Sequence, residues 1–101
     1  MKAFVPGKGL VDTVRRRVTI QNSRGLHARA AAKFATMAGG FQSSVQVTRG
    51  GQTVSGLSIM GLMMLAASPG SELDLEAQGA DAEAAIDALQ ALVDDRFEEA
   101  G

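Results

Sequence analysis

The chain contains no cysteine, tryptophan or tyrosine, and His27 is its only histidine. The absence of cysteine excludes disulfide bonds and thiolate metal sites, and a single histidine argues against a zinc site built from protein ligands. We therefore expect no metal and no cofactor. Hydrophobic residues make up 46% of the sequence, but many are alanine and only four are aromatic, all of them phenylalanine. This composition predicts one small domain with a modest core.

Long hydrophobic runs are also absent. The longest run, residues 59–67, includes Gly61 and is too short to span a bilayer. Pro6, Gly7 and Gly9 interrupt the beginning of the chain, which has no apolar signal core. We expect a cytoplasmic protein without membrane insertion, in which residues 1–12 form an N-terminal extension and residues 13–101 form the folded domain.

Charge is unevenly distributed along the chain, although the net charge is only −1. Residues 1–33 hold eight of the ten Lys and Arg residues, and residues 71–101 hold ten of the eleven acids. Two interpretations stand side by side. The charges form two solvated faces of one fold, or a basic surface attracts an acidic partner or a phosphate group.

Hydrophobic periodicity predicts alternating strands and helices. The predicted strands cover residues 14–20, 44–48, 53–55 and 72–77, and the predicted helices cover residues 28–38, 58–67 and 82–98. Arg49-Gly50-Gly51-Gln52 is typical of a hairpin turn, and Asp81 is a candidate N-cap of the last helix. The order β-α-β-β-α-β-α predicts an α+β fold in which helices cover one face of a mostly antiparallel sheet.

His27 lies between a turn glycine, Gly25, and the helix-forming stretch that begins at Ala28. The start of a helix offers free backbone N–H groups and the positive end of the helix dipole. This setting suits a phosphate group, to which Arg29 would add donors. Imidazole is also a nucleophile near neutral pH. A basic residue in the first turn opposes the dipole, and local conflicts of this kind are typical of functional sites. The pattern favours a phosphoryl-carrying histidine over an N-cap without chemistry.

Ser58 is the second candidate site residue, and it precedes a segment that is hydrophobic on nearly every side. An N-cap role is the simplest interpretation of this serine. A helix that lies on a sheet buries only one stripe, so Ile59, Met60 and Met63 are expected to stay partly exposed. Methionine-rich exposed surface suits the docking of partners. A phosphate on Ser58 would add charge beside that surface.

Two motifs resemble the family of histidine-containing phosphocarrier proteins of the phosphoenolpyruvate-dependent phosphotransferase system, commonly called HPr. The first is GLHAR at residues 25–29 followed by AAKF at residues 31–34, and the second is GLSIMGLM at residues 56–63. The separation of the two motifs and the order of the elements agree with the family as well. The resemblance covers roughly residues 14–97.

The resemblance implies an open-faced β-sandwich, with a four-stranded antiparallel sheet covered on one face by three helices. It implies that His27 accepts a phosphoryl group on ring Nδ1 from phosphorylated enzyme I and passes it to an enzyme IIA-type acceptor. The phosphate would be bound by Arg29 and by the helix-start N–H groups of Ala28, Arg29 and Ala30. It also implies that HPr kinase/phosphorylase modifies Ser58. Such a protein is a carrier and not an enzyme, and we expect a monomer.

Ala30 departs from the family pattern, which usually has proline at this position. As the third residue of the helix, it has an N–H group without an intrahelical partner, so proline there is tolerated and not required. Alanine raises helix propensity and restores one donor near the phosphate. With alanine in place of proline, two outcomes are open. Either the phosphate site works as it does in the family, or the start of the helix is less rigid than in the family.

Two other functions fit part of the sequence. An RNA-binding sheet has a similar element order, and residues 15–17 are all arginine. However, such sheets stack bases on aromatic residues of their strands, and none of the four phenylalanines lies on a predicted strand, so we expect no nucleic-acid binding. The other function is a regulatory member of the same family, acting outside sugar transport or in the nitrogen-related variant of the pathway. It would use the same two sites.

Overall fold

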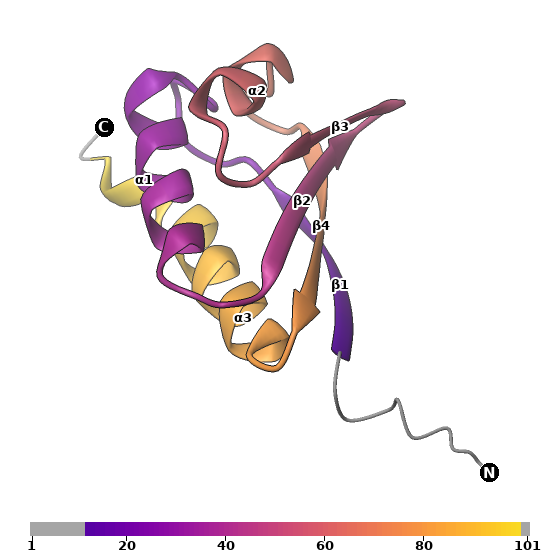
Figure 1. Cartoon of the computed structure of the whole chain (residues 1–101). Coiled ribbons are helices and arrows are strands. Elements are labelled where there is room, and N and C mark those ends of the chain that lie inside the picture. Colours follow the sequence, from indigo (N-terminus) through magenta and orange to yellow (C-terminus); the bar gives the residue numbers. More distant parts are fainter. Residues whose placement is uncertain (1–11, 100–101) are drawn as a thin grey trace, which may run out of the picture.

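The computed structural model describes residues 12–99, in which helices cover one face of a four-stranded sheet (Figure 1). The elements are β1 (Asp12–Thr19), α1 (Ala28–Gly39), β2 (Ser44–Arg49), β3 (Gln52–Ser55), α2 (Ile59–Met64), β4 (Glu72–Gly79), α3 (Ala82–Asp94) and the short 3-10 helix η1 (Arg96–Glu98). All neighbouring strands are antiparallel, in the order β1-β4-β2-β3. The predicted α+β fold, an open-faced sandwich with three α-helices on one side, is confirmed.

The core lies between the sheet and the helices. Alternate residues of the two central strands, Val45 and Val47 of β2 with Leu73 and Leu75 of β4, point to the helix side and are buried. Phe34 of α1 has no exposed surface and packs into the same cluster. Because side chains alternate along a strand, the intervening polar residues face solvent on the open side of the sheet.

The arginines of the edge strand β1 are paired with acids. On the open face, Arg17 Nε donates to Asp74 of β4 at 2.8 Å, which lowers the pKa of that carboxyl group. Arg16 points to the helix side, where its Nη1 lies 2.6 Å from Asp87 and its Nη2 lies 3.1 Å from Glu83, both on α3. The acidic end of the chain therefore lies against this basic strand. For the arginines of β1, this pairing supports the interpretation of solvated faces of one fold.

Two helices are shorter than predicted. α2 ends at Met64 and not at residue 67, because Ala66 has a φ of +53°, outside the helical region. α3 ends at Asp94 and not at residue 98, although Phe97 is 1% exposed. The apolar period detected the burial of Phe97 correctly, but this residue lies in η1, where its φ of +53° is outside the α-helical region, and not in α3. Among the described residues, no helix has the length and apolar character needed to cross a bilayer.

Two further predictions differ from the structure at their boundaries. β1 begins at Asp12, the last residue of the predicted extension, and residues 1–11 lie outside the described residues. Asp81 precedes α3 as predicted, but its side chain makes no cap hydrogen bond. Instead, its carboxylate accepts from the backbone N–H groups of Gln42 at 2.8 Å and Ser43 at 2.9 Å, and from the Ser43 hydroxyl. These bonds, above all the one from the Ser43 hydroxyl, lower the pKa of Asp81. The Asp81 side chain therefore holds the segment after α1 in place and does not cap α3.

Candidate functional site

A glycine turn sets the position of His27. Gly25 has a φ of +65°, and a Cβ atom there would collide with the carbonyl oxygen of Ala67. The next residue, Leu26, is buried and donates its N–H to the same carbonyl at 2.9 Å. The loop before α1 is thus fixed against the segment that follows α2. His27 comes next as the N-cap residue of α1, with the extended backbone expected at that position.

The His27 ring does not cap the helix but contacts a carboxylate. No side-chain cap bond is made, and Nε2 lies 2.7 Å from Oε2 of Glu99. The His27 side chain is 22% exposed, so part of the ring reaches the surface. Within residues 12–99, no hydrogen bond to Nδ1 is present. One ring nitrogen is therefore engaged by the protein, and the other has no hydrogen-bond partner among residues 12–99.

Asn22 is hydrogen-bonded to the same carboxylate as His27. Its Nδ2 donates to the same Glu99 oxygen at 2.9 Å and to the carbonyl of Gly25 at 2.7 Å. The hydrogen bond from Asn22, followed by that from His27, lowers the pKa of Glu99. The sequence did not predict either partner. Asn22 lies in a polar turn, and Glu99 is 72 positions from His27, so only the folded chain brings them together.

The predicted phosphate-binding residues form the first turn of α1. The first intrahelical bond runs from the N–H of Ala31 to the carbonyl of His27 at 2.8 Å, which leaves the N–H groups of Ala28, Arg29 and Ala30 without helical partners. Arg29 is exposed, and in the described part of the chain it forms no ion pair. No cluster of three or more metal-ligating side chains occurs among residues 12–99. The available donors suit an anion.

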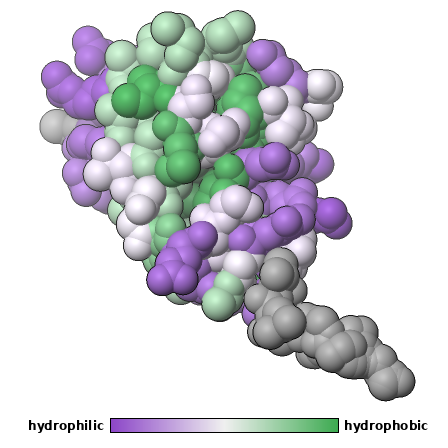
Figure 2. All heavy atoms as spheres, viewed as in Figure 1, coloured by the Kyte–Doolittle hydropathy of each residue, from purple (hydrophilic) through white to green (hydrophobic). Residues whose placement is uncertain are grey.

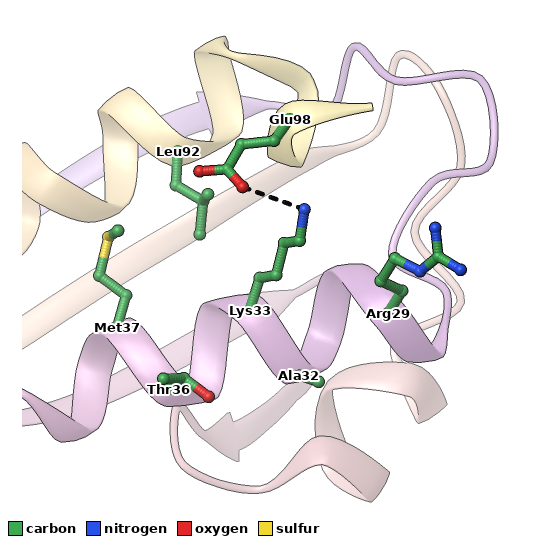
Figure 3. A pocket seen from close by; sticks show the side chains of 7 residues that line it. All are labelled: Arg29, Ala32, Lys33, Thr36, Met37, Leu92 and Glu98. Atoms are coloured by element: carbon green, nitrogen blue, oxygen red, sulfur yellow. Dashed lines mark hydrogen bonds and ion pairs between the residues drawn. The ribbon is translucent and has the colours of Figure 1, made fainter. Parts of the chain in front are cut away.

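A surface groove of about 340 Å³ begins beside Arg29 and runs between α1 and the segment formed by α3 and η1 (Figure 3). Lys33 crosses it, with its Nζ 3.1 Å from Glu98 and 2.9 Å from the carbonyl oxygen of Phe97. Figure 3 shows the Arg29 guanidinium apart from this ion pair, at the start of α1. Lys33 therefore connects η1 to α1, while Arg29 is exposed at the start of α1, two residues after His27.

Ser58 is the N-cap of α2, as predicted, because its Oγ accepts from the N–H of Gly61 at 2.9 Å. Behind it, Leu62 is buried, and the three predicted docking residues are exposed. Leu57 and Met64, which the sequence did not single out, are 60% and 64% exposed. We call these exposed residues the α2 patch: Leu57, Ile59, Met60, Met63 and Met64. Figure 2 shows hydrophobic residues gathered at the top of the molecule, where α2 lies in Figure 1.

The sequence of most of the chain matches a known protein family. Residues 14–95 match the family model described as the PTS HPr component phosphorylation site. The chain belongs to the HPr family. A phosphocarrier protein HPr of Cupriavidus necator is 51% identical over 86 residues, which cover 85% of this chain and 97% of that protein. A phosphocarrier protein NPr of Shewanella violacea is 46% identical over 85 residues, 84% of this chain and 93% of that protein.

The similarity to HPr extends to the three-dimensional structure. The crystal structure of HPr-C-His from Thermoanaerobacter tengcongensis superposes with a TM-score of 0.82 at 41% identity, covering 85% of this chain and 97% of that one. Both candidate sites, at His27 and at Ser58, fall inside the HPr family match. Glu99 lies beyond the end of that match.

Proposed function

We propose that the protein carries a phosphoryl group on Nδ1 of His27, taken from phosphorylated enzyme I and given to an enzyme IIA-type acceptor. The observation that carries this proposal is the placement of a partly exposed imidazole at the N-terminus of α1, with Nε2 engaged and Nδ1 without a partner among residues 12–99. Membership of a phosphocarrier family supports it.

The transfer needs no proton to leave the protein. The Nδ1 lone pair attacks the phosphorus atom, and the bond between the phosphorus and the donor breaks, with its electron pair going to the donor. Arg29 and the N–H groups of Ala28, Arg29 and Ala30 face the charge on the phosphoryl oxygens. The reverse displacement passes the group to the acceptor. Because partner proteins supply the remaining catalytic groups, the chain acts as a carrier and not as an enzyme.

The α2 patch is the proposed docking surface for these partners. It is apolar and exposed, and α2 packs beside α1. The loop before His27 is hydrogen-bonded to the segment that follows α2, so the α2 patch and the histidine belong to neighbouring segments, which supports a docking role for the patch. Ser58 begins α2, and we propose that HPr kinase/phosphorylase modifies it to control docking.

Replacing Ser58 with aspartate will weaken binding of the protein to enzyme I by roughly fivefold to tenfold, about 1 kcal/mol. Aspartate is a good N-cap, so α2 stays folded while a charge appears beside the apolar patch. Titration calorimetry with enzyme I measures the effect. The matched control is Ser44→Asp, at an exposed serine of β2, which should bind normally. Unchanged affinity of Ser58→Asp would leave this serine with its capping role alone.

Restoring the usual proline at Ala30 will lower the rate of phosphoryl transfer from enzyme I by about threefold, because the phosphoryl group loses one N–H donor. The N–H group of Ala30 has no helical partner, so the helix does not depend on it. Rapid-quench measurements on wild type and Ala30→Pro test this. A gain of about tenfold, or 1.4 kcal/mol of barrier, would show that alanine weakens the site.

The protein that accepts the phosphoryl group determines which pathway the carrier serves. Relatives named HPr and NPr are both among the similar proteins, and both sugar transport and a purely regulatory role use the same two sites. Incubation with phosphoenolpyruvate, enzyme I and a set of purified acceptors identifies the protein that takes the group from His27. We expect this to occur in the cytoplasm, with the carrier acting as a monomer.

A further inference from the structure

We propose that Glu99 is a positioning residue, which holds the ring proton of His27 on Nε2 so that Nδ1 keeps its lone pair for the phosphoryl group. The inference rests on the proposed function, and it concerns a residue outside the region that matches the HPr family model. The pair is specific in the structure: Nε2 and the Glu99 oxygen are 2.7 Å apart, and the Glu99 side chain is only 12% exposed.

The chemistry of the two groups determines which atom carries the proton. An ionised carboxylate only accepts hydrogen bonds, so the ring nitrogen facing it must donate. The lowered pKa of Glu99 keeps the carboxylate ionised at neutral pH. The neutral ring then carries its proton on Nε2, and Nδ1 is the basic, nucleophilic nitrogen. The hydrogen bond made by one ring nitrogen thus selects the reactivity of the other.

A second hydrogen bond orients the carboxylate of Glu99. The Glu99 oxygen that meets His27 also accepts from Nδ2 of Asn22, whose side chain is fully buried. The same nitrogen of Asn22 donates to the carbonyl of Gly25, in the turn that leads to His27. The carboxylate is therefore fixed relative to the backbone that carries the histidine, and it is not a mobile surface acid that meets the ring by chance.

The path of the chain after α3 is consistent with this role. Arg96, Phe97 and Glu98 all have positive φ values, between +53° and +65°, which side-chain-bearing residues rarely adopt in succession. The turn is held by the buried Phe97 ring and by Lys33, which bonds to the Phe97 carbonyl and to Glu98. An unfavourable backbone that the surroundings enforce is typical of functional sites. Here it returns the chain to the histidine.

Glu99 also faces the charge that the reaction creates. When Nδ1 forms its bond to phosphorus, the ring keeps its Nε2 proton and becomes a cation. No proton is released, and no external base is required. The carboxylate at Nε2 is then opposite a positive charge, which strengthens the hydrogen bond in the phosphorylated form. Phosphorylation of His27 is favoured on both counts, by the tautomer of the free ring and by the charge of the product.

The direct test measures the tautomer without any phosphoryl transfer. Nitrogen-15 NMR of the His27 ring, in its neutral form, should show the Nε2–H tautomer in at least tenfold excess in the wild type. In Glu99→Ala the excess should fall at least threefold. Asp94→Ala is the matched control, since it removes an exposed acid near the same end of α3 that forms no ion pair among the described residues. An unchanged tautomer ratio in Glu99→Ala, or an equal change in Asp94→Ala, would overturn the proposal.

A second measurement separates position from charge. In Glu99→Gln, the amide oxygen can still accept from Nε2, so the tautomer should be retained while the rate of phosphorylation by enzyme I falls. In Glu99→Ala both should fall, with the rate reduced about tenfold or more. Full activity of Glu99→Ala with an altered tautomer would contradict the role of Glu99 in transfer. If the wild type is not phosphorylated at all, the proposed function fails, whereas the tautomer result stands separately.

Discussion

Replacing His27 with alanine will abolish phosphorylation of the protein by enzyme I and leave the fold intact. His27 is the only histidine in the chain, so no other residue can carry a phosphohistidine. The imidazole makes no cap bond to α1, and its one hydrogen bond is to Glu99 near the surface. The core cluster does not include this side chain. We expect the free energy of unfolding to fall by about 1 kcal/mol, the usual net cost of losing one hydrogen bond, here the bond to Glu99.

The measurement combines labelled phosphoenolpyruvate, enzyme I and either wild type or His27→Ala, with circular dichroism to compare the folds. Arg29→Ala serves as the matched control, because it alters the same helix turn but keeps the nucleophile. It should accept label more slowly and still accept it. Label on folded His27→Ala at the wild-type level would place the acceptor elsewhere in the chain.

Replacing Met60 with aspartate will reduce affinity for enzyme I by about 30-fold, or 2 kcal/mol. Met60 is 71% exposed, the highest value in the α2 patch, and it does not support the core. Its replacement therefore leaves the free protein stable. In the complex, however, a carboxylate would be buried against an apolar surface without a partner, which is unfavourable.

Titration calorimetry with enzyme I measures this loss, with Gln46→Asp as the control. Gln46 is exposed on β2, away from the patch, and the substitution adds the same charge. The control should bind within about twofold of wild type. Equal affinities for Met60→Asp and Gln46→Asp would remove the α2 patch from the docking surface.

Local patterns in the sequence predicted most of the fold. Alternation in β2 and β4 indicated which residues face the helices, and Val47 and Leu75 are indeed fully buried. Helix ends were harder to predict, because an apolar period records burial and not backbone conformation. Phe97 continues the stripe of α3 and is buried, but positive φ values place it in a turn after the helix.

The candidate site was predictable only in part, for a similar reason. His27, Arg29 and Ser58 have recognisable neighbours within a few residues, and the structure places two of the three, His27 and Ser58, at the N-cap positions expected. Glu99 has no such local signal, because its partner is 72 positions away. The uneven charge along the chain was visible as well, but only the structure shows that Arg16 and Arg17 pair with acids of α3 and β4.

The most direct test of the central claim is to locate the phosphoryl group after wild-type protein is incubated with phosphoenolpyruvate and enzyme I. Mass spectrometry under conditions that preserve phosphoramidates identifies the residue, and NMR of the labelled ring identifies the nitrogen. We predict a single phosphoryl group on Nδ1 of His27, which is lost when an enzyme IIA-type acceptor is added. A protein that takes up no phosphoryl group, or that carries it on Nε2 or on another residue, would contradict the account.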